Sequence, residues 1–131
     1  MAGETDLERL LASMRPTLQP GEYVFTTAEG ELEGVEPVVM VREAEGVTLV
    51  LDRAQADAEG LRYDYVAAMV TLRVHSSLDA VGLTAAVAQE LTAHGISCNV
   101  VAGYFHDHLF VPHERGPEVV EMLSALAWRH R

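Results

Sequence analysis

The sequence predicts an α+β fold of the ferredoxin-like βαββαβ type, in two units with antiparallel sheets and helices on one face. Two observations predict it. The hydrophobic pattern gives the element order α-βββ-α in the first half of the chain and β-α-ββ-α in the second. The second half therefore lacks only one strand of the pattern, and its strand–helix–strand segments impose right-handed crossovers. The first half is large enough for a divergent or permuted copy, and it could also donate the missing strand.

The first half begins with a predicted helix. Thr5 and Glu8 have the spacing of a capping box, and Pro16 ends the helix. Its apolar face contains Leu7, Leu10, Leu11 and Met14. Segments rich in β-branched residues then alternate with turn signals, and a short helix begins at Asp52 and stops at Gly60. We expect strands over 23–27, 38–42 and 47–51, the last two joined as a hairpin, and a helix over 52–58.

The second half has longer elements. Alternate apolar residues from 70 to 74 should form the core face of a strand. Leu83, Val87 and Leu91 share one face of the following helix, which Gly95 stops. Pro117 fits the first turn of the last helix. We expect a strand over 66–75, a helix over 78–94, strands over 96–105 and 108–111 joined by a tight turn at 106–107, and a helix over 114–131.

Charge and histidine content divide the chain into two parts. The formal net charge is −11, from nine arginines, no lysine and twenty acidic residues. Fourteen of the acidic residues lie in residues 1–65, whereas all six histidines lie in residues 66–131. Together with the element order, this predicts an N-terminal unit over 1–65 and a C-terminal unit over 66–131. Any imidazole chemistry must come from the C-terminal unit.

The composition excludes several classes of function. Without lysine there is no Schiff-base, P-loop or catalytic lysine. A strongly acidic chain repels nucleic-acid phosphates and anionic lipids, so we expect neither as a partner. The single cysteine excludes an intramolecular disulfide and a paired-cysteine zinc site. The N-terminus lacks the apolar segment of a secretory signal, and no apolar run reaches the ~20 residues of a membrane span. These features predict a soluble cytoplasmic protein.

The junction between the strand 66–75 and the next helix is the main candidate binding site. A helix N-terminus has unpaired N–H groups and a partial positive charge, so the backbone after Ser76 suits a carboxylate. Asp79 or a sheet-edge carbonyl near Val100 could hold an ammonium group, and Asn99 can both donate and accept hydrogen bonds. Gly82 would let backbone approach closely. The alternative is that Ser76 and Asp79, at capping-box spacing, only cap their own helix.

Two further features of the sequence could bind a metal or act as a nucleophile. His106 and His108 flank Asp107, and imidazoles at this spacing can share one side of a strand and bind Zn²⁺. The alternative is a polar hairpin turn, since a metal site needs at least three ligands. Cys98 alternates with apolar residues on its strand, which favours a buried thiol over a nucleophile. The sequence contains no hydrolase nucleophile elbow, His-Glu-x-x-His motif or glycine-rich phosphate loop.

The segment 74–112 resembles the core of an ACT domain, and the opening 10–27 resembles the first unit of small bacterial proteins with tandem ACT units. The resemblance implies a regulatory module that binds an amino acid and pairs with a second copy. It places the ligand at the first strand–helix loop and the next strand of a neighbouring unit. The implied residues are His75, Ser76, Ser77, Asp79, Val81, Gly82 and Leu83 on the loop, and Asn99, Val100 and Val101 on the strand. Where many amino-acid-binding ACT domains have an Asp-x-Pro-Gly loop, this chain has Ser-Ser-Leu-Asp.

We therefore expect a non-catalytic protein that binds a small effector, most simply an amino acid, as a cytoplasmic homodimer without a cofactor. Two alternatives belong to other classes. One is an interaction module that pairs through an exposed sheet edge. The other is a metal-dependent enzyme centred on His106 and His108 with a third ligand.

Overall fold

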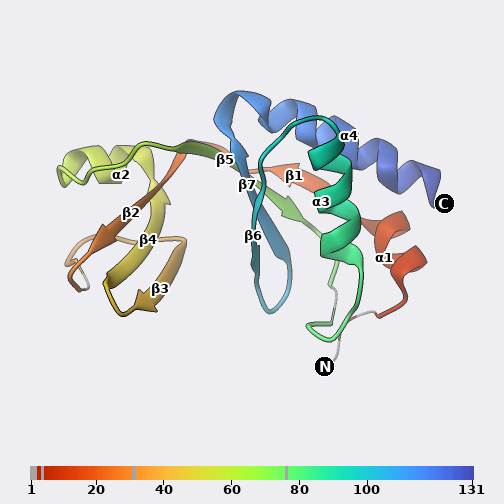
Figure 1. Ribbon diagram of the computed structural model, residues 1–131, viewed down its shortest axis with the longest axis horizontal. Helices are drawn as coiled ribbons and strands as arrows, with labels where there is room; N and C mark the ends of the chain where they lie inside the picture. The colour runs from red at the N-terminus through yellow and green to blue at the C-terminus, as the bar shows by residue number, and fades with distance from the viewer. Residues whose placement is uncertain (1–2, 4, 31, 76) are drawn as a thin grey trace. The chain divides into compact units, whose positions relative to one another are not determined.

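The computed structural model describes residues 3, 5–30, 32–75 and 77–131. The chain folds into two compact units, which we call unit 1 (residues 1–19 and 68–131) and unit 2 (residues 20–67). One strand contributes to both units, because β5 (Val66–Leu72) begins in unit 2 and continues in unit 1. Figure 1 shows the path of the chain through these elements.

Unit 1 has the complete ferredoxin-like set of elements. They are α1 (Leu7–Ser13), β1 (Pro16–Leu18), most of β5, α3 (Leu83–Ala93), β6 (Asn99–Ala102), β7 (Asp107–Pro112), the 3₁₀ turn η1 (His113–Arg115) and α4 (Gly116–Arg129). Its strands lie in the order β1-β5-β7-β6. β1 is antiparallel to β5, with Pro16 opposite Leu72 and Leu18 opposite Val70. The N-terminal segment thus supplies the strand that the C-terminal half lacks.

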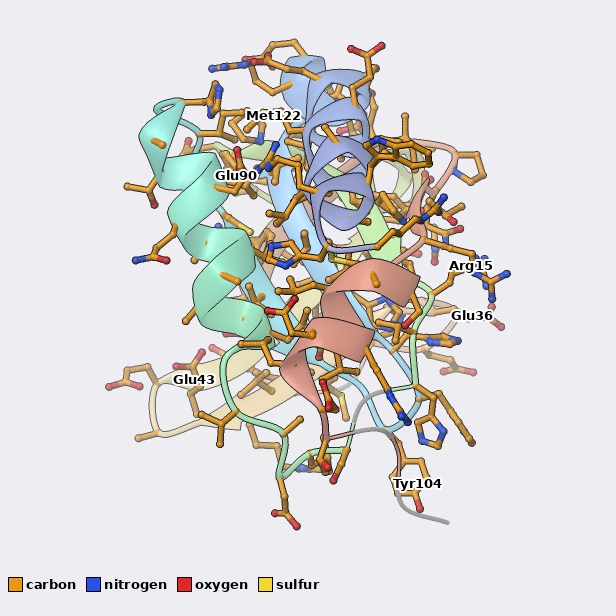
Figure 2. The ribbon with its side chains drawn as sticks, turned by 90° about the vertical axis from the view of Figure 1, so that its right-hand side faces the viewer. Arg15, Glu36, Glu43, Glu90, Tyr104 and Met122 are labelled. Atoms are coloured by element: carbon orange, nitrogen blue, oxygen red, sulfur yellow. The ribbon has the colours of Figure 1, made fainter. Side chains whose placement is uncertain are left out.

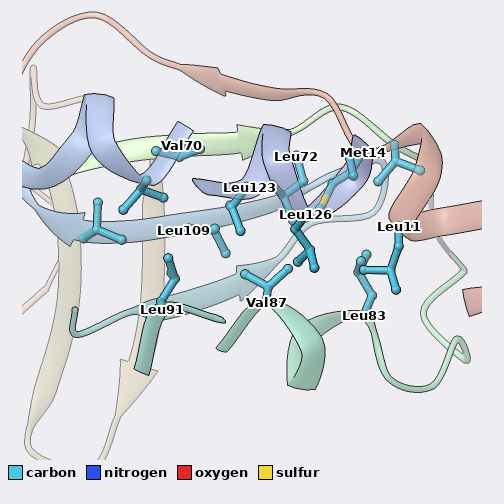
Figure 3. Close-up of a cluster of buried hydrophobic side chains, with 14 of the residues drawn as sticks. Leu11, Met14, Val70, Leu72, Leu83, Val87, Leu91, Leu109, Leu123 and Leu126 are labelled. Carbon is cyan, nitrogen blue, oxygen red and sulfur yellow. The ribbon is translucent and has the colours of Figure 1, made fainter. Parts of the chain in front are cut away.

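The core of unit 1 lies between its helices and one face of its strands. Side chains alternate along β5 and β7, so every second one points toward the helices. The apolar residues of α3 and α4 repeat with the 3.6-residue helical period and form a stripe that packs against these side chains. Figure 3 shows this cluster, to which α1 also contributes. Its fully buried members include Leu10, Val70, Leu72, Val87, Leu91, Leu109 and Leu123.

Unit 2 repeats the strand order and has one helix among its described residues. Its elements are β2 (Tyr23–Ala28), β3 (Val39–Glu43), β4 (Gly46–Asp52), α2 (Arg53–Ala58) and the start of β5. The strands lie in the order β3-β4-β2-β5, all antiparallel. The segment between β2 and β3 has no helix among its described residues, so a loop takes the place of the first crossover helix. Val24, Leu49 and Leu51 centre a smaller core.

The predicted fold class and the type of each element are confirmed, and several boundaries are corrected. Asp6, not Thr5, caps α1, since its carboxylate accepts a hydrogen bond from the N–H of Arg9 at 3.2 Å. The strand predicted over 66–75 ends at Leu72, and that over 96–105 is confined to residues 99–102. The turn predicted at 106–107 lies at 103–106, where the N–H of Gly103 bonds the carbonyl of His106.

The largest correction concerns the start of α3. The predicted helix over 78–94 begins only at Leu83, because Gly82 has a φ of 102° and cannot continue a right-handed helix. Leu78 and Val81, which the prediction included in the helix, are 68% and 81% exposed and lie outside the core stripe of Leu83, Val87 and Leu91. Gly95, with a φ of 69°, follows the helix as predicted.

Candidate functional site

A small pocket lies in unit 1 where the loop before α3 meets the facing ends of β6 and β7. Its volume is about 120 Å³. The lining residues are Ser77, Leu78, Ala80, Gly82, Leu83, Thr84, Ala102 and Asp107. Hairpin pairing explains the last two, because Ala102 and Asp107 lie directly opposite each other at the end of the β6–β7 ladder.

The loop on one side of the pocket is held by a local turn. The hydroxyl oxygen of Ser77 accepts a hydrogen bond from the N–H of Asp79 at 3.2 Å, and the Ser77 carbonyl accepts one from the N–H of Ala80 at 2.9 Å. This is the behaviour that gives serine its preference for turns. The hydroxyl proton of Ser77 remains available to donate.

The start of α3 supplies backbone donors to the pocket. The N–H of Ala86 makes the first helical bond, to the carbonyl of Gly82 at 2.9 Å. The N–H groups of residues 83–85 therefore precede the helical hydrogen-bond ladder, and no side chain among the described residues caps this end. They carry the partial positive charge of the helix dipole. Leu83 and Thr84 both line the pocket, so this end of the helix suits an anionic group.

Asp107 brings a carboxyl group to the same pocket. It is the first residue of β7 and only 9% exposed. Burial raises its pKa above the usual value, and the neighbouring imidazoles of His108 and His106 partly offset this effect. A carboxylate that has lost its water favours a cationic partner. The pocket therefore combines a carboxyl group that can bind a cation with backbone N–H groups that can bind an anion.

His108 lies next to Asp107 in the chain but makes different contacts. Its Nδ1 is 3.0 Å from Oγ1 of Thr71, which also accepts a hydrogen bond from the side-chain amide of Gln19. Burial lowers the pKa of His108, as do His106 and Arg73, while Asp107 acts against them. The neutral imidazole is thus favoured.

The residues that could bind a metal do not cluster in the part of the chain that the structure describes. Among residues 3, 5–30, 32–75 and 77–131, no three His, Cys, Asp or Glu side chains lie close enough to share an ion. His106 and His108 thus have no third ligand in this part of the chain. Cys98 is half-buried, packs against the core of unit 1 and has its pKa raised by burial to about 11, which leaves it protonated near neutral pH.

The sequence-predicted site residues divide into groups. Ser77, Gly82 and Leu83 line the pocket. His75 lines a second pocket of unit 1, and Ser76 lies outside the described residues. The remaining five, which do not line the pocket of Ser77, are Asp79, Val81, Asn99, Val100 and Val101.

Two predicted roles are corrected by the position of the helix. The backbone after Ser76 does not form a helix N-terminus, since α3 starts at Leu83. For the same reason Asp79 does not cap this helix, and the predicted role of Ser76 as a cap lies outside the described residues. The sequence reasoning also missed Thr84, Ala102 and Asp107. A carboxylate two residues before the apolar run 109–111 was the available signal, but the tight turn predicted at 106–107 placed it in the hairpin.

Unit 2 has a pocket of a different kind. It has a volume of about 370 Å³, and its described lining is apolar: Leu32, Val35, Pro37, Met40 and Leu49. The loop that replaces the first crossover helix contributes three of these side chains. This described lining contains no counterpart of the Asp107 carboxyl group or of the helix N-terminus in the pocket of unit 1.

Comparison with known families identifies the fold. One family model of the ACT domain matches residues 2–68, and a second matches residues 66–125. The chain belongs to the ACT domain family. The two matches cover nearly all of the chain, so it is a tandem ACT protein, with the second half completed by β1. The boundary predicted between residues 65 and 66 stays a prediction.

Solved structures share this architecture. A Vibrio cholerae protein of unknown function, described as a possible transport protein, is 48% identical with a TM-score of 0.84, over 92% of this chain and 95% of that one. The regulatory subunit of aspartate kinase from Thermus thermophilus is 8% identical with a TM-score of 0.61, over 88% and 98%. Aspartokinase III from E. coli, solved with aspartate and ADP, is 15% identical with a TM-score of 0.63, over 86% and 33%. The search of curated proteins gave no match. None of the described helices is both long and apolar enough to cross a bilayer.

Proposed function

We propose that this ACT protein is a non-catalytic regulatory module that binds a small α-amino acid in the pocket between Ser77, the start of α3 and Asp107. The observation that carries the proposal is the pairing of opposite electrostatic features in one pocket. The N-terminus of α3 and the buried carboxyl group of Asp107 both line it. A zwitterion presents the two complementary charges.

The proposed binding mode assigns each charged group of the ligand. The ligand carboxylate accepts hydrogen bonds from the N–H groups of Leu83 and Thr84 and from the hydroxyl of Ser77. The ligand ammonium donates to the Asp107 carboxylate, an interaction that burial strengthens. The volume of about 120 Å³ is small beside the ~300–1,000 Å³ of pockets for drug-sized ligands, which favours an amino acid with a short side chain.

The comparisons support the regulatory part of the proposal. ACT-domain membership and the fold shared with an aspartate kinase regulatory subunit favour control of another activity over catalysis. The aspartate present in the E. coli aspartokinase III structure is consistent with an amino acid as the class of effector. We keep a cytoplasmic location as part of the proposal.

We propose that a second copy of the chain pairs at β6. This strand is the last in the order of the unit 1 sheet, so one side of it has no strand partner among the described residues. Such edges pair readily with another strand. Ala102 of β6 lines the pocket, so pairing there would place a second copy beside the ligand. Sedimentation over a range of concentrations should show a dimer, and a monomer throughout would refute this pairing.

Thermal unfolding with each of the twenty amino acids tests the binding proposal. A ligand at a hundred times its Kd should stabilise the protein by about 2.7 kcal/mol, which at least one amino acid should reach at millimolar concentration. Asp107→Asn should abolish the increase in Tm. Asp79→Asn is the matched control, since it changes an exposed carboxylate of the same loop that does not line the pocket. A lack of any increase in the wild type, or an unchanged increase in Asp107→Asn, would contradict the proposal.

A further inference from the structure

A second pocket of unit 1 gathers basic side chains. It has a volume of about 440 Å³ and lies beside the end of β5, with lining residues from the end of α1 and from the C-terminal residue. Its lining residues are Ser13, Arg15, Arg73, Val74, His75 and Arg131. It thus contains three of the nine arginines of a chain whose net charge is −11. None of its lining residues belongs to the pocket of Asp107.

Two of these arginines lie directly opposite each other. The N–H of Arg73 donates to the carbonyl of Arg15 at 3.1 Å, which extends the β1–β5 ladder beyond the pair of Pro16 and Leu72. Side chains opposite each other in an antiparallel pair have Cβ atoms about 4.5–5.5 Å apart, and like charges there are destabilising. Nε of Arg73 donates to the hydroxyl of Thr17 at 3.2 Å, which holds its guanidinium on the same face as Arg15.

No carboxylate offsets this repulsion among the residues that the structure describes. Arg53, Arg115 and Arg129 form ion pairs with Glu22, Glu118 and Glu90. In contrast, no described acidic side chain forms an ion pair with Arg15 or Arg73, while Arg131 lies over the ring of Trp128 at 5.1 Å. The side chain of Arg15 extends outward from the unit (Figure 2). Uncompensated guanidinium groups held side by side are a recognition element for a multivalent anion.

Aromatic rings continue from the same pocket. The ring of His75 lies 5.7 Å from that of Phe105 and 6.4 Å from that of Tyr104, which meet edge to face at 5.1 Å. Phe105 and Tyr104 are each 62% exposed at the tip of the β6–β7 hairpin. Figure 2 shows Tyr104 at the outside of this loop. His75 thus joins the basic pocket to a solvent-facing aromatic surface.

We propose that this pocket binds a phosphate ester with a planar ring, of the class of nucleoside monophosphates, as a second ligand of the protein. The guanidinium groups of Arg15 and Arg73 would hold the phosphate, since their fork geometry matches its oxygens. The rings of His75 and Phe105 would stack with the base, as exposed aromatic side chains stack with bases in proteins that bind single-stranded nucleic acids. The site is distinct from the proposed amino-acid pocket and does not depend on it.

Calorimetric titration with AMP and with inorganic phosphate tests the proposal on the full chain. AMP should bind the wild type at least tenfold more tightly than inorganic phosphate does. The double variant Arg15→Gln with Arg73→Gln should weaken AMP binding at least tenfold. Arg62→Gln is the matched control, because Arg62 is an exposed arginine of unit 2, and it should leave the affinity unchanged.

Two further variants separate the parts of the proposal. Phe105→Ala should weaken AMP binding severalfold and leave phosphate binding unchanged, whereas Asp107→Asn should alter neither. Circular dichroism checks that each variant is folded, and the double arginine variant should melt at the same or a higher temperature because a repulsion is removed. Absence of AMP binding to the wild type, or equal binding to the double arginine variant, would overturn the proposal.

Discussion

Asp107 carries a buried carboxyl group, and burying its ionised form destabilises the folded protein. This cost is the main reason to assign the residue a function. Desolvation raises its pKa, and the two neighbouring histidines only partly compensate. A neutral residue of the same shape would avoid this cost. A bound ammonium group would offset it, because an opposite charge favours the ionised carboxylate. The residue therefore fits ligand recognition better than it fits stability.

The first prediction concerns the stability of Asp107→Asn without ligand. A folded-state pKa above the unfolded value means that protonation favours the folded state, so this contribution is present at low pH and lost as the pH rises through the folded pKa. The amide has no such pH dependence. Asp107→Asn should therefore melt above the wild type at pH 8, and the difference should shrink toward pH 4. Calorimetric scans across this range provide the measurement, and a variant that melts lower at pH 8 would show that Asp107 is stabilising.

The second prediction concerns Cys98. Its pKa of about 11 and its half-buried position leave little thiolate at pH 8. The alkylation rate with iodoacetamide should be lower than that of an unperturbed thiol by about 100-fold, following the thiolate fraction. The same protein in concentrated urea should react at the ordinary rate. Fast labelling of the folded protein would contradict the burial of this side chain.

At the scale of elements, the loop before α3 decides the shape of the candidate site. Gly82 combines a φ of 102° with a close approach to α1, since a Cβ there would lie 3.0 Å from Cδ2 of Leu7. The glycine therefore turns the chain into the helix and allows α1 to pack beside it. Because α3 starts directly after this residue, its first turn includes Leu83 and Thr84, which line the pocket.

The third prediction is that Gly82→Ala destabilises the protein by about 1–3 kcal/mol, since an L side chain is strained in this conformation. It should also abolish the increase in Tm produced by an amino acid. Gly30→Ala is the control, because a Cβ there has no atom within 4 Å, and it should change the stability by less than about 0.5 kcal/mol. Urea denaturation of both variants makes the comparison. Equal stability of the two would refute the structural role of Gly82.

Local patterns located the elements but not the site. Periodicity and turn residues identified the helices and every strand except β1, and Asp52, Gly95 and Pro117 lie at the ends of elements as predicted. The start of α3 was misplaced because the predicted helix included the apolar residues Leu78 and Val81, which are solvent-exposed and precede the turn at Gly82. Periodicity reports spacing, and it does not report whether a neighbouring element covers an apolar residue.

The pocket itself required tertiary information. Asp107 and Thr84 are far apart in the sequence, and only the pairing of β6 with β7 and the packing of α3 bring them to one place. The opposition of Arg15 and Arg73 likewise depends on the register between β1 and β5. The sequence raised strand donation as one option, but it does not determine that register.

At the scale of the whole molecule, unit 1 is closed by residues from both ends of the chain. α1 supplies Leu10 and Leu11, together with its C-cap residue Met14, to a core otherwise formed by residues 68–127. Contacts of such high sequence separation are formed at an entropic cost, which the burial of these side chains offsets. The N-terminal segment is therefore part of the fold of the second ACT unit.

The fourth prediction tests this closure. Leu10 is 0% exposed, and Leu10→Ala should destabilise the protein by about 2–5 kcal/mol, as expected for a large-to-small change in a core. Val81→Ala, at a side chain that is 81% exposed, should change the stability by less than about 0.5 kcal/mol. Urea denaturation followed by circular dichroism measures both. A similar effect of the two substitutions would show that α1 is not part of the core.

The central claim is that one pocket of unit 1 holds a zwitterion between α3 and Asp107. Amide chemical shifts in a ¹⁵N-labelled protein test it most directly during titration with the amino acid that raises the Tm most. The amides of Leu83, Thr84 and Asp107 should shift together and saturably in the wild type, and they should not shift in Asp107→Asn. Shifts confined to other residues, or shifts of these amides that survive in Asp107→Asn, would contradict the claim.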